Sequence, residues 1–372
     1  MSAKVGRIAQ LVEELAPRKL AEDWDRVGLQ VGDPREEVTG VLVALELTEE
    51  VLDEAVEQSA EMVVVHHPLI FKGLSALRYD SNPGYLVQKM AAHGFHLYVA
   101  HTNLDAAVGG TGDLLAKKLA LEETEVLVES HRQRFYKLVV FLPQGHEDEI
   151  RDSLARAGAG WIGNYSHCTF QAPGTGTFKP LPGTDPFVGK VGQVEKVSEY
   201  RLETIVPEDR LKAAVKAMKE AHPYEEVAYD VYPLAEPEKL VGSGRVGRLK
   251  EETTLRDFIA RLQEVLGVKH LRYVGDLNRP VRKVGVLPGS GGDFVARAAS
   301  RGADVYVTGD VKYHQARLAE DLGLAVVDPG HYATETPVIE VLAHHLQTRL
   351  REEGSEARVY ISRKLKDPFQ FL

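Results

Sequence analysis

The sequence lacks the features of cross-linked, membrane-spanning and nucleic-acid-binding proteins. Cys168 is the only cysteine among 372 residues, which excludes an intramolecular disulfide bond. No apolar run approaches the roughly 20 residues that a membrane-spanning helix requires. The formal net charge of -10 argues against nucleic acid or an anionic membrane surface as the main partner, because both attract clustered lysine and arginine. We therefore expect no membrane partner, and nucleic acid is disfavoured.

The N-terminal segment also lacks the apolar core of a secretory signal peptide. Lys4, Arg7, Glu13 and Glu14 interrupt residues 1–15 in the pattern of an amphipathic helix. We therefore expect a cytoplasmic protein. What the sequence does contain is 44% hydrophobic residues, enough for a large core. Its length favours roughly two or three domains.

Two stretches of the chain follow the same plan of strand, helix and strand. Their elements are expected at 41–45, 49–58 and 62–65, and again at 284–288, 293–301 and 305–308. A shift of 243 positions aligns the two stretches, so that Val41 falls on Val284 and His67 falls on Asp310. The shared spacing predicts two α/β units of similar build.

Both stretches continue into a third strand that leads to a histidine and then to an acid four residues later. The first leads to His101 and Asp105, and the second to His331 and Glu335. Chance similarity between two generic units would explain the shared spacing, but the repeated histidine and acid favour a pseudo-repeat. We therefore predict an α/β fold in which two pseudo-repeated lobes form one core and the ends of their strands converge.

The segment between the two stretches has a different character. Its pattern predicts a strand at 136–142, a helix at 147–157, a turn-rich stretch at 174–189, a strand at 200–206, a helix at 207–221 and a strand at 227–233. This split β-α-β order is typical of a small ferredoxin-like sandwich, which a host protein can accept in a loop. We predict an inserted ferredoxin-like α+β domain at 129–237, within a core formed by 1–128 and 238–372.

The adjacent histidines His66 and His67 follow the apolar strand at 62–65. Neighbouring side chains on a strand point to opposite faces, so the two imidazoles are expected to serve two different ions, with the chain turning before Pro68. A single buried histidine is more often a hydrogen-bonded core residue than a metal ligand. Here the partners at the other strand ends favour the ligand interpretation.

In a helix that begins near Ala333 or earlier, residues four apart share one face, which places His331 beside Glu335. Glu335 could then bridge two ions. The candidate metal ligands are His66, His67, Asp105, His331 and Glu335.

This mixed nitrogen and oxygen set suits zinc, manganese or iron, with zinc preferred, and it suits calcium and copper(I) poorly. Five ligands cannot saturate two ions, so open positions would hold water. A pair of ions about 3.5 to 4 Å apart lowers the pKa of such a water from about 15.7 to about 7. The sequence therefore predicts two divalent ions per chain and hydrolytic chemistry.

Two further histidines, His101 and His314, are not needed as primary ligands. Either could orient a ligand or move protons, which makes both candidate catalytic residues. The alternative is that His101 caps a strand and that His314 lies on a solvated helix.

Two other motifs also have two interpretations. The stretch 287–293 joins a strand to a helix with four glycine or serine residues, so it could hold a phosphate. It lacks the Gly-Lys-Ser/Thr ending of a nucleotide-binding loop, and a tight turn is favoured. The stretch 222–226, His-Pro-Tyr-Glu-Glu, could bind a metal weakly, but a turn into a strand is favoured.

Four other side chains are expected to lie outside the site. His344 and His345 fall on a C-terminal helix, where we expect both to be solvated. Trp24 and Trp161 are expected to be packing residues.

Four motifs together resemble the GTP cyclohydrolase 1 type 2 homologues, also called Nif-three-like proteins, over the whole chain. They are His66-His67-Pro68, His101-Thr-Asn-Leu-Asp105, Glu22-Asp-Trp-Asp-Arg-Val-Gly-Leu29 and Gly330-His-Tyr-Ala-Thr-Glu335. The resemblance implies a two-lobed α/β core with a dinuclear metal site, a toroidal homohexamer with sites facing an internal cavity, and the same five ligands. Longer members carry an insert that resembles PII and CutA proteins. Two positions depart from the family pattern, since Arg26 stands in place of asparagine and Thr336 in place of arginine.

The leading hypothesis is a metal-dependent hydrolase that acts on a small polar substrate, such as a nucleotide or another cyclic amide or phosphate compound. The family name does not by itself establish GTP cyclohydrolase activity, and the sequence contains no guanine-specific motif. The alternative is a regulatory or scaffold oligomer with a structural or sensory metal site, whose PII-like insert binds a ligand or partner. Open coordination positions distinguish a catalytic site from a structural one.

Overall fold

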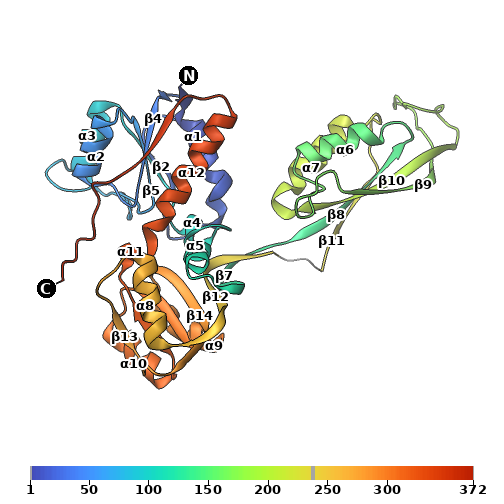
Figure 1. The fold of residues 1–372 in the computed structure, drawn as a ribbon. Coiled ribbons are helices and arrows are strands. Elements are labelled where there is room, and N and C mark those ends of the chain that lie inside the picture. The colour runs from blue at the N-terminus through green and yellow to red at the C-terminus, as the bar shows by residue number, and fades with distance from the viewer. Residues whose placement is uncertain (1, 236–238, 372) are drawn as a thin grey trace. The chain divides into compact units, whose positions relative to one another are not determined.

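The computed structural model describes residues 2–235 and 239–371, and the chain divides into two compact units. The core unit comprises Met1–His131 and Val241–Leu372, and the inserted unit comprises Arg132–Leu240. The predicted first boundary, at 128/129, lies three residues before this division. The predicted second boundary, between 237 and 238, lies outside the described residues. In Figure 1 the colour follows residue number, so the inserted unit is drawn in the green to yellow-green part of the scale.

The first sheet of the core unit has the strand order β17-β4-β5-β6-β2. These strands are β17 (Arg358–Ile361), β4 (Gly40–Ala44), β5 (Met62–Val65), β6 (His96–Val99) and β2 (Gly28–Val31). The first four run parallel, and β2 is antiparallel to β6. The central strands are buried on both faces, which explains why they are almost entirely apolar, with His96 at the start of β6 as the exception.

Helices cover both faces of this sheet. Val41 and Val43 pack with α1 (Val5–Leu15) and α12 (Pro337–Glu352) on one face. Leu42 packs with α2 (Glu49–Glu57) and α3 (Gly84–His93) on the other face, as the alternation of strand side chains requires. The short strands β1 (Ala3–Lys4) and β3 (Glu37–Val38) pair separately.

The second sheet of the core unit has the order β13-β16-β15-β14-β12-β7. These strands are β13 (Arg272–Val274), β16 (Ala325–Asp328), β15 (Val305–Gly309), β14 (Pro280–Ser290), β12 (Lys239–Thr254) and β7 (Glu122–Gln133). Strands β14, β15 and β16 run parallel. Helices α5 (Thr111–Lys118) and α8 (Leu255–Leu266) cover one face, and α9 (Val295–Ser300) and α10 (Tyr313–Asp321) cover the other.

The two parallel trios, β4-β5-β6 and β14-β15-β16, follow the same order along the chain and across their sheets. Each predicted strand and helix of these trios is present, with bounds shifted by a few residues. Two one-turn helices follow the third strands, α4 (Thr102–Ala106) after β6 and α11 (His331–Glu335) after β16. His66, His101 and His331 therefore come shortly after the carboxyl ends of the parallel strands β5, β6 and β16.

The inserted unit contains a four-stranded antiparallel sheet in the order β11-β8-β10-β9. Its elements in chain order are β8 (Phe135–Pro143), α6 (Glu147–Arg156), β9 (Thr169–Phe178), β10 (Glu195–Pro207), α7 (Leu211–Ala221) and β11 (Tyr229–Pro233). Both helices pack on one face, against residues such as Leu138 and Leu202. Strand β9 occupies the start of the stretch that was expected to consist of turns.

Some smaller expectations were wrong. Trp24 and Trp161 are 54% and 51% exposed, so neither is a buried packing residue. His344 is exposed as expected, but His345 is half-buried and its Nε2 lies 2.8 Å from the Leu11 carbonyl oxygen, because α12 packs against α1.

In the described ranges, no helix combines the length and apolar character that crossing a membrane requires.

Candidate metal centre

The chain bends directly after β5, and this bend places both adjacent histidines at one site. The amide of His66 donates to the Leu45 carbonyl at 3.1 Å, and the amide of His67 donates to the same oxygen at 2.7 Å. The ring centroids of the two histidines lie 5.1 Å apart. The strict alternation of a strand therefore stops at Val65, and both imidazoles turn toward the same cluster.

His66 is the most buried member of the cluster. Its Nδ1 lies 2.8 Å from the Ala100 carbonyl oxygen, which only accepts, so Nδ1 carries the proton. Its Nε2 is buried and has no hydrogen-bond partner among the described residues. The nearest acidic oxygens are Oδ1 of Asp105 at 3.6 Å and Oε1 of Glu335 at 3.8 Å.

Glu335 occupies the centre of the cluster and is 4% exposed. Its Oε2 lies 2.8 Å from Nε2 of His67 and 2.8 Å from Nε2 of His331. The single turn of α11 brings His331 beside Glu335, as the spacing predicts. Because Oε1 faces His66 while Oε2 faces the other two histidines, the carboxylate stands between two groups of donors.

His331 is oriented from behind by Asp310, whose Oδ2 lies 2.8 Å from Nδ1 of His331. Asp310 adopts a positive φ of 56° directly after β15. It is the residue that the internal alignment places opposite His67. This position thus holds the His331 imidazole in place instead of contributing an imidazole of its own.

Asp105 lies on α4 and is oriented by Thr111 at the start of α5, whose hydroxyl donates to Oδ1 of Asp105 at 2.7 Å. This leaves the carboxylate facing His66. Both residues of the first His-x3-acid motif therefore reach the cluster, since His101 also groups with His66 and His67.

His101 is held by Asp25, whose carboxylate oxygens both lie 3.0 Å from Nδ1 of His101. Asp25 is buried and also accepts from the amide and hydroxyl of Thr102. Burial opposes ionisation, but the hydrogen bonds from His101 and Thr102 prevail and lower the pKa of Asp25 to about 2. The carboxylate thus keeps the proton of His101 on Nδ1, so Nε2 is the nitrogen available to the cluster.

Three groups of potential ligands emerge among the described residues: His66, His67 and His101; His67, His331 and Glu335; and His66, Asp105 and Glu335. All five predicted ligands and the predicted catalytic His101 lie in them. The second predicted catalytic residue, His314, is exposed on α10 and belongs to none of the three.

The stretch 287–293 supports the cluster through a tight turn. The amide of Gly289 donates to the Thr334 hydroxyl at 3.0 Å, and the amide of Gly291 donates to the Thr308 hydroxyl at 2.9 Å. These amides are therefore already satisfied, which favours the turn over a phosphate site. Gly289 has a φ of +70°, and a Cβ there would lie 2.0 Å from Oε1 of Glu335.

The charges of the cluster are strongly coupled. Burial disfavours the charged form of His66, but the Asp105 and Glu335 carboxylates outweigh it and raise its pKa to about 9. Burial is likewise outweighed at His331, where Glu335 and Asp310 raise the pKa to about 9. Burial raises the pKa of Asp105, whereas the hydrogen bond from His331 and the nearby imidazoles of His66 and His67 overcome burial and hold the pKa of Glu335 well below its usual value.

The spacing of several donor atoms is compatible with a bound metal ion. Nε2 of His67 and Nε2 of His331 lie 3.3 Å apart, so the two ring nitrogens converge on one region beside Glu335. Ligands bound at about 2.0 to 2.2 Å in a tetrahedral arrangement lie roughly 3.3 to 3.6 Å apart. The separations of 3.3 Å between His67 and His331 and of 3.6 Å between His66 and Asp105 lie in this range, whereas the 2.8 Å contacts of Glu335 are those of hydrogen bonds. Together with the partnerless Nε2 of His66, the two longer separations show that these residues fit a divalent cation.

Sequence reasoning missed the residues that orient the ligands. Asp25, Thr111 and Asp310 are common residue types without a spacing rule, although Asp25 falls within the recognised motif at 22–29. It also missed an aromatic wall. The rings of Trp24 and Phe71 are exposed, and their centroids lie 6.2 Å and 6.5 Å from that of His101.

Fold and site together define an α/β protein with a buried cluster of histidines and carboxylates that could hold metal ions. The chain belongs to the Duf34/NIF3 (NGG1p interacting factor 3) family, whose model matches residues 3–368. It is 44% identical over 366 residues to a GTP cyclohydrolase 1 type 2 homolog of Bacillus subtilis, covering 98% of each chain. It is 45% identical over 365 residues to one of Halalkalibacterium halodurans, again covering 98% of each.

Solved structures agree with this assignment. The crystal structure of a Bacillus cereus protein related to NIF3 matches with a TM-score of 0.92 and 44% identity, covering 100% of this chain and 99% of that one. A Staphylococcus aureus protein matches with a TM-score of 0.77 and 30% identity, covering 100% and 99%. The mixed α/β architecture described above is therefore that of the NIF3 fold.

Proposed function

We propose that the chain is a metal-dependent hydrolase with a dinuclear divalent centre that acts on a small polar substrate, such as a nucleotide or a cyclic amide. The observation that carries this proposal is the arrangement around Glu335. One carboxylate oxygen faces His66, and the other contacts His67 and His331. We interpret the two parallel trios as pseudo-repeated lobes, each supplying one half of the centre.

In this proposal, His66 and Asp105 would hold one ion, His67 and His331 would hold the other, and Glu335 would bridge them. Zinc is the preferred metal, with manganese or iron as alternatives. A dinuclear centre supplies an acidified water and stabilises negative charge that develops on the substrate. The side chains of Asp25, Thr111 and Asp310, which contact the proposed ligands and His101, would keep the centre's geometry fixed.

The other residues near the cluster have separate tasks. His101 is suited to move a proton through Nε2, because Asp25 fixes its other nitrogen. His314 remains a second, more distant candidate for proton transfer. Trp24 and Phe71 offer exposed ring faces beside His101, on which a flat substrate can stack.

The test is to strip the purified protein with a chelator and restore zinc, manganese or iron separately while nucleotides and small cyclic amides are screened for hydrolysis. The proposal expects turnover with at least one metal and loss of that turnover in Asp105→Asn. No turnover with any metal, together with unchanged assembly of Asp105→Asn, would overturn the enzyme proposal.

The second candidate is a regulatory or scaffold oligomer in which the metal is structural or sensory. It is favoured by the inserted unit, which forms its own compact body with its own core. Its β-α-β-β-α-β order and antiparallel sheet suit a ferredoxin-like domain of the PII and CutA type. In this case the metal should change the mass of the assembly and not support turnover.

We further propose a homohexamer in the cytoplasm, on the basis of the family resemblance. Each chain has a mass of 41.1 kDa, so light scattering should give six times this value. A monomer or dimer at micromolar concentration would contradict the hexamer.

Metal binding is expected to release protons and to strengthen as pH rises. Because the pKa values of His66 and His331 are about 9 without metal, both imidazoles are cationic at neutral pH. A metal must displace one proton from each ring to bind it. The folded pKa values exceed the ordinary value of 6.5, so this charge pairing stabilises the metal-free protein fully below about pH 6.5 and is lost as pH rises through about 9.

Calorimetry of zinc binding in buffers of different ionisation enthalpy measures the number of protons. We expect more than one proton released near pH 7 and at least about tenfold tighter binding at pH 8 than at pH 6. Release of no protons and a flat pH profile would contradict this charge assignment.

Asp310→Asn is expected to weaken metal binding about 10- to 100-fold, although Asp310 is not a proposed ligand. The amide can no longer attract the Nδ1 proton of His331 with a full negative charge, so the imidazole becomes a poorer ligand. Competition with a fluorescent chelator measures the affinity. Asp321→Asn, an exposed aspartate at the end of α10, is the matched control and should bind metal normally. Equal metal affinities of the two variants would show that Asp310 does not support metal binding.

A further inference from the structure

The inserted unit contains a cavity of about 750 Å³. Every residue that lines it belongs to the inserted unit, whereas all five proposed metal ligands belong to the core unit. This volume suits a small molecule, because ligand pockets typically measure about 300 to 1,000 Å³. The cavity lies on the sheet face opposite α6 and α7. Phe141 and Glu199 line it, whereas Leu142 and Leu202, which point to the other face of the same two strands, pack under the helices.

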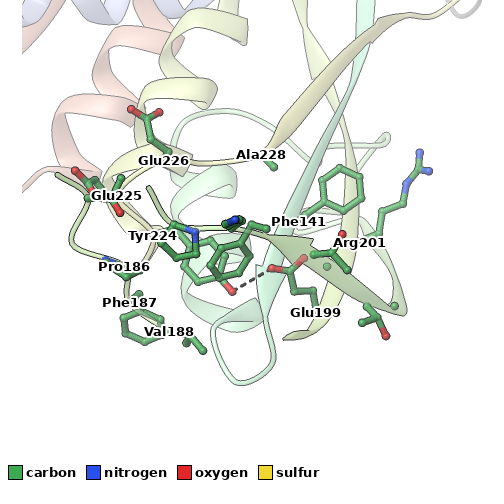
Figure 2. Close-up of a pocket in the computed structure, with 18 of the residues that line it drawn as sticks. Phe141, Pro186, Phe187, Val188, Glu199, Arg201, Tyr224, Glu225, Glu226 and Ala228 are labelled. Atoms are coloured by element: carbon green, nitrogen blue, oxygen red, sulfur yellow. Dashed lines mark hydrogen bonds between the residues drawn. The ribbon is translucent and has the colours of Figure 1, made fainter. Parts of the chain in front are cut away.

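Aromatic rings form the walls of this cavity. Tyr224 is central, with ring centroids 6.2 Å from Phe178 and 6.0 Å from Phe187. Phe141 and Pro186 extend the apolar lining, and Figure 2 shows these side chains around Tyr224. Flat rings at such distances favour a planar ligand that stacks or packs edge to face.

His222 holds this aromatic wall in place. Its Nδ1 accepts from the amide of Tyr224 at 3.0 Å, and its Nε2 donates to the Phe141 carbonyl at 3.0 Å. Burial lowers the pKa of His222, consistent with a neutral ring. Both nitrogens are therefore engaged, which disfavours the weak metal site considered for 222–226 and supports the turn.

A buried acid completes the site. Glu199 is only 8% exposed, and the Tyr224 hydroxyl donates to its Oε1 at 3.0 Å, as the dashed line in Figure 2 shows. Among the described residues, no cation pairs with Glu199 and no donor reaches Oε2. Arg201, the nearest cation on the same strand face, pairs instead with Glu203 at 3.2 Å. A carboxylate this buried normally has a positive or N–H partner.

Strand β9 leaves room for this carboxylate. Gly176 pairs across from Val197 on β10, and a Cβ at Gly176 would lie 2.0 Å from Oε2 of Glu199. The absence of a side chain lets the carboxylate lie against the strand. The free oxygen therefore lies in a cavity whose lining is mainly aromatic and apolar but also includes Lys179 and Arg201.

We propose that this cavity is a binding site for a planar nitrogen heterocycle that carries an amino group, of the kind found in the amino-substituted nucleobases. Glu199 binds the N–H donors, and the ring packs against Tyr224, Phe178 and Phe187. The carboxylate accepts what such an amino group donates, and the aromatic walls match its flat faces. This inference concerns the inserted unit alone and does not rest on the proposed hydrolase.

The test uses three pairs of nucleosides: guanosine with inosine, which lacks the amino group, and adenosine with inosine and cytidine with uridine, in which a carbonyl group and a ring N–H replace the amino group. Calorimetry with the full-length protein should show at least one amino-bearing nucleoside binding about tenfold or more tightly than its partner. Glu199→Gln should abolish that preference. Glu149→Gln, an exposed glutamate on α6, is the matched control and should retain it.

Phe187→Ala provides a second variant that should fold normally, because this ring is 55% exposed, and it should weaken binding of the same nucleoside at least about fivefold. Chelator-treated protein should bind the nucleoside as tightly as untreated protein, which separates this site from the metal centre. Absence of binding by every nucleoside, equal binding within each pair, or unchanged binding by Glu199→Gln would each overturn the proposal. A change in assembly mass of Glu199→Gln without any nucleoside binding would show that the cavity faces another copy of the chain, which also overturns it.

Discussion

Glu335→Gln is expected to lower the metal content from two ions per chain to one or none. The carboxylate contacts the two histidines of one donor group and faces His66 of the other, so its loss removes a ligand from both proposed ions at once. In the metal-free protein, the change also leaves charged imidazoles without their buried partner, which typically costs about 3 to 5 kcal/mol. Elemental analysis of the purified protein measures the metal content, and urea unfolding measures the stability.

Glu340→Gln is the matched control, because this glutamate is exposed on α12. It should retain two ions and the unfolding midpoint of the parent. Two tightly held ions in Glu335→Gln would contradict the bridging role. Loss of metal from both variants would indicate a general effect of altering this region and not a ligand effect.

Gly289→Ala is expected to disrupt the metal centre without changing any ligand. A Cβ at this position would lie 2.0 Å from Oε1 of Glu335 and 3.4 Å from Nε2 of His331. The carboxylate must therefore move, and overpacking of a buried site typically costs about 1 to 3 kcal/mol. The positive φ of +70° adds strain of about 1 to 2 kcal/mol for a residue with a side chain.

Gly323→Ala separates these two contributions. Gly323 has a φ of +65°, but a Cβ there would meet nothing within 4 Å. This control should lose only the backbone contribution and keep its metal. We expect Gly289→Ala to be the less stable variant in thermal unfolding and to bind zinc at least about tenfold more weakly. Equal stability and full metal content in both variants would show that Glu335 does not need its present position.

The parallel strands were predictable because apolar runs bounded by polar residues carry a direct physical signal. Met62–Val65, for example, is a strand with the predicted bounds, since all four side chains are buried. Strand β9 was not predicted, because Gly174 and Gly176 are typical of turns when seen alone. Its pairing with β10 across ten positions supplies the stability that local sequence does not show.

The clustering of the candidate ligand side chains was predictable, but their surroundings were not. His331 and Glu335 follow a helical spacing, and α11 places them together. Asp25 is 76 positions from His101, and no local rule links such distant residues. The exposure of Trp24 was also unpredictable, because a large aromatic residue gives the same sequence signal in a core and on the surface.

The most direct test of the central claim is an anomalous difference map from crystals grown with zinc. The account predicts two peaks per chain about 3.5 to 4 Å apart, one beside His66 and Asp105 and one beside His67 and His331, with Glu335 between them. A single peak, no peak, or peaks away from these side chains would contradict a dinuclear centre built from both lobes.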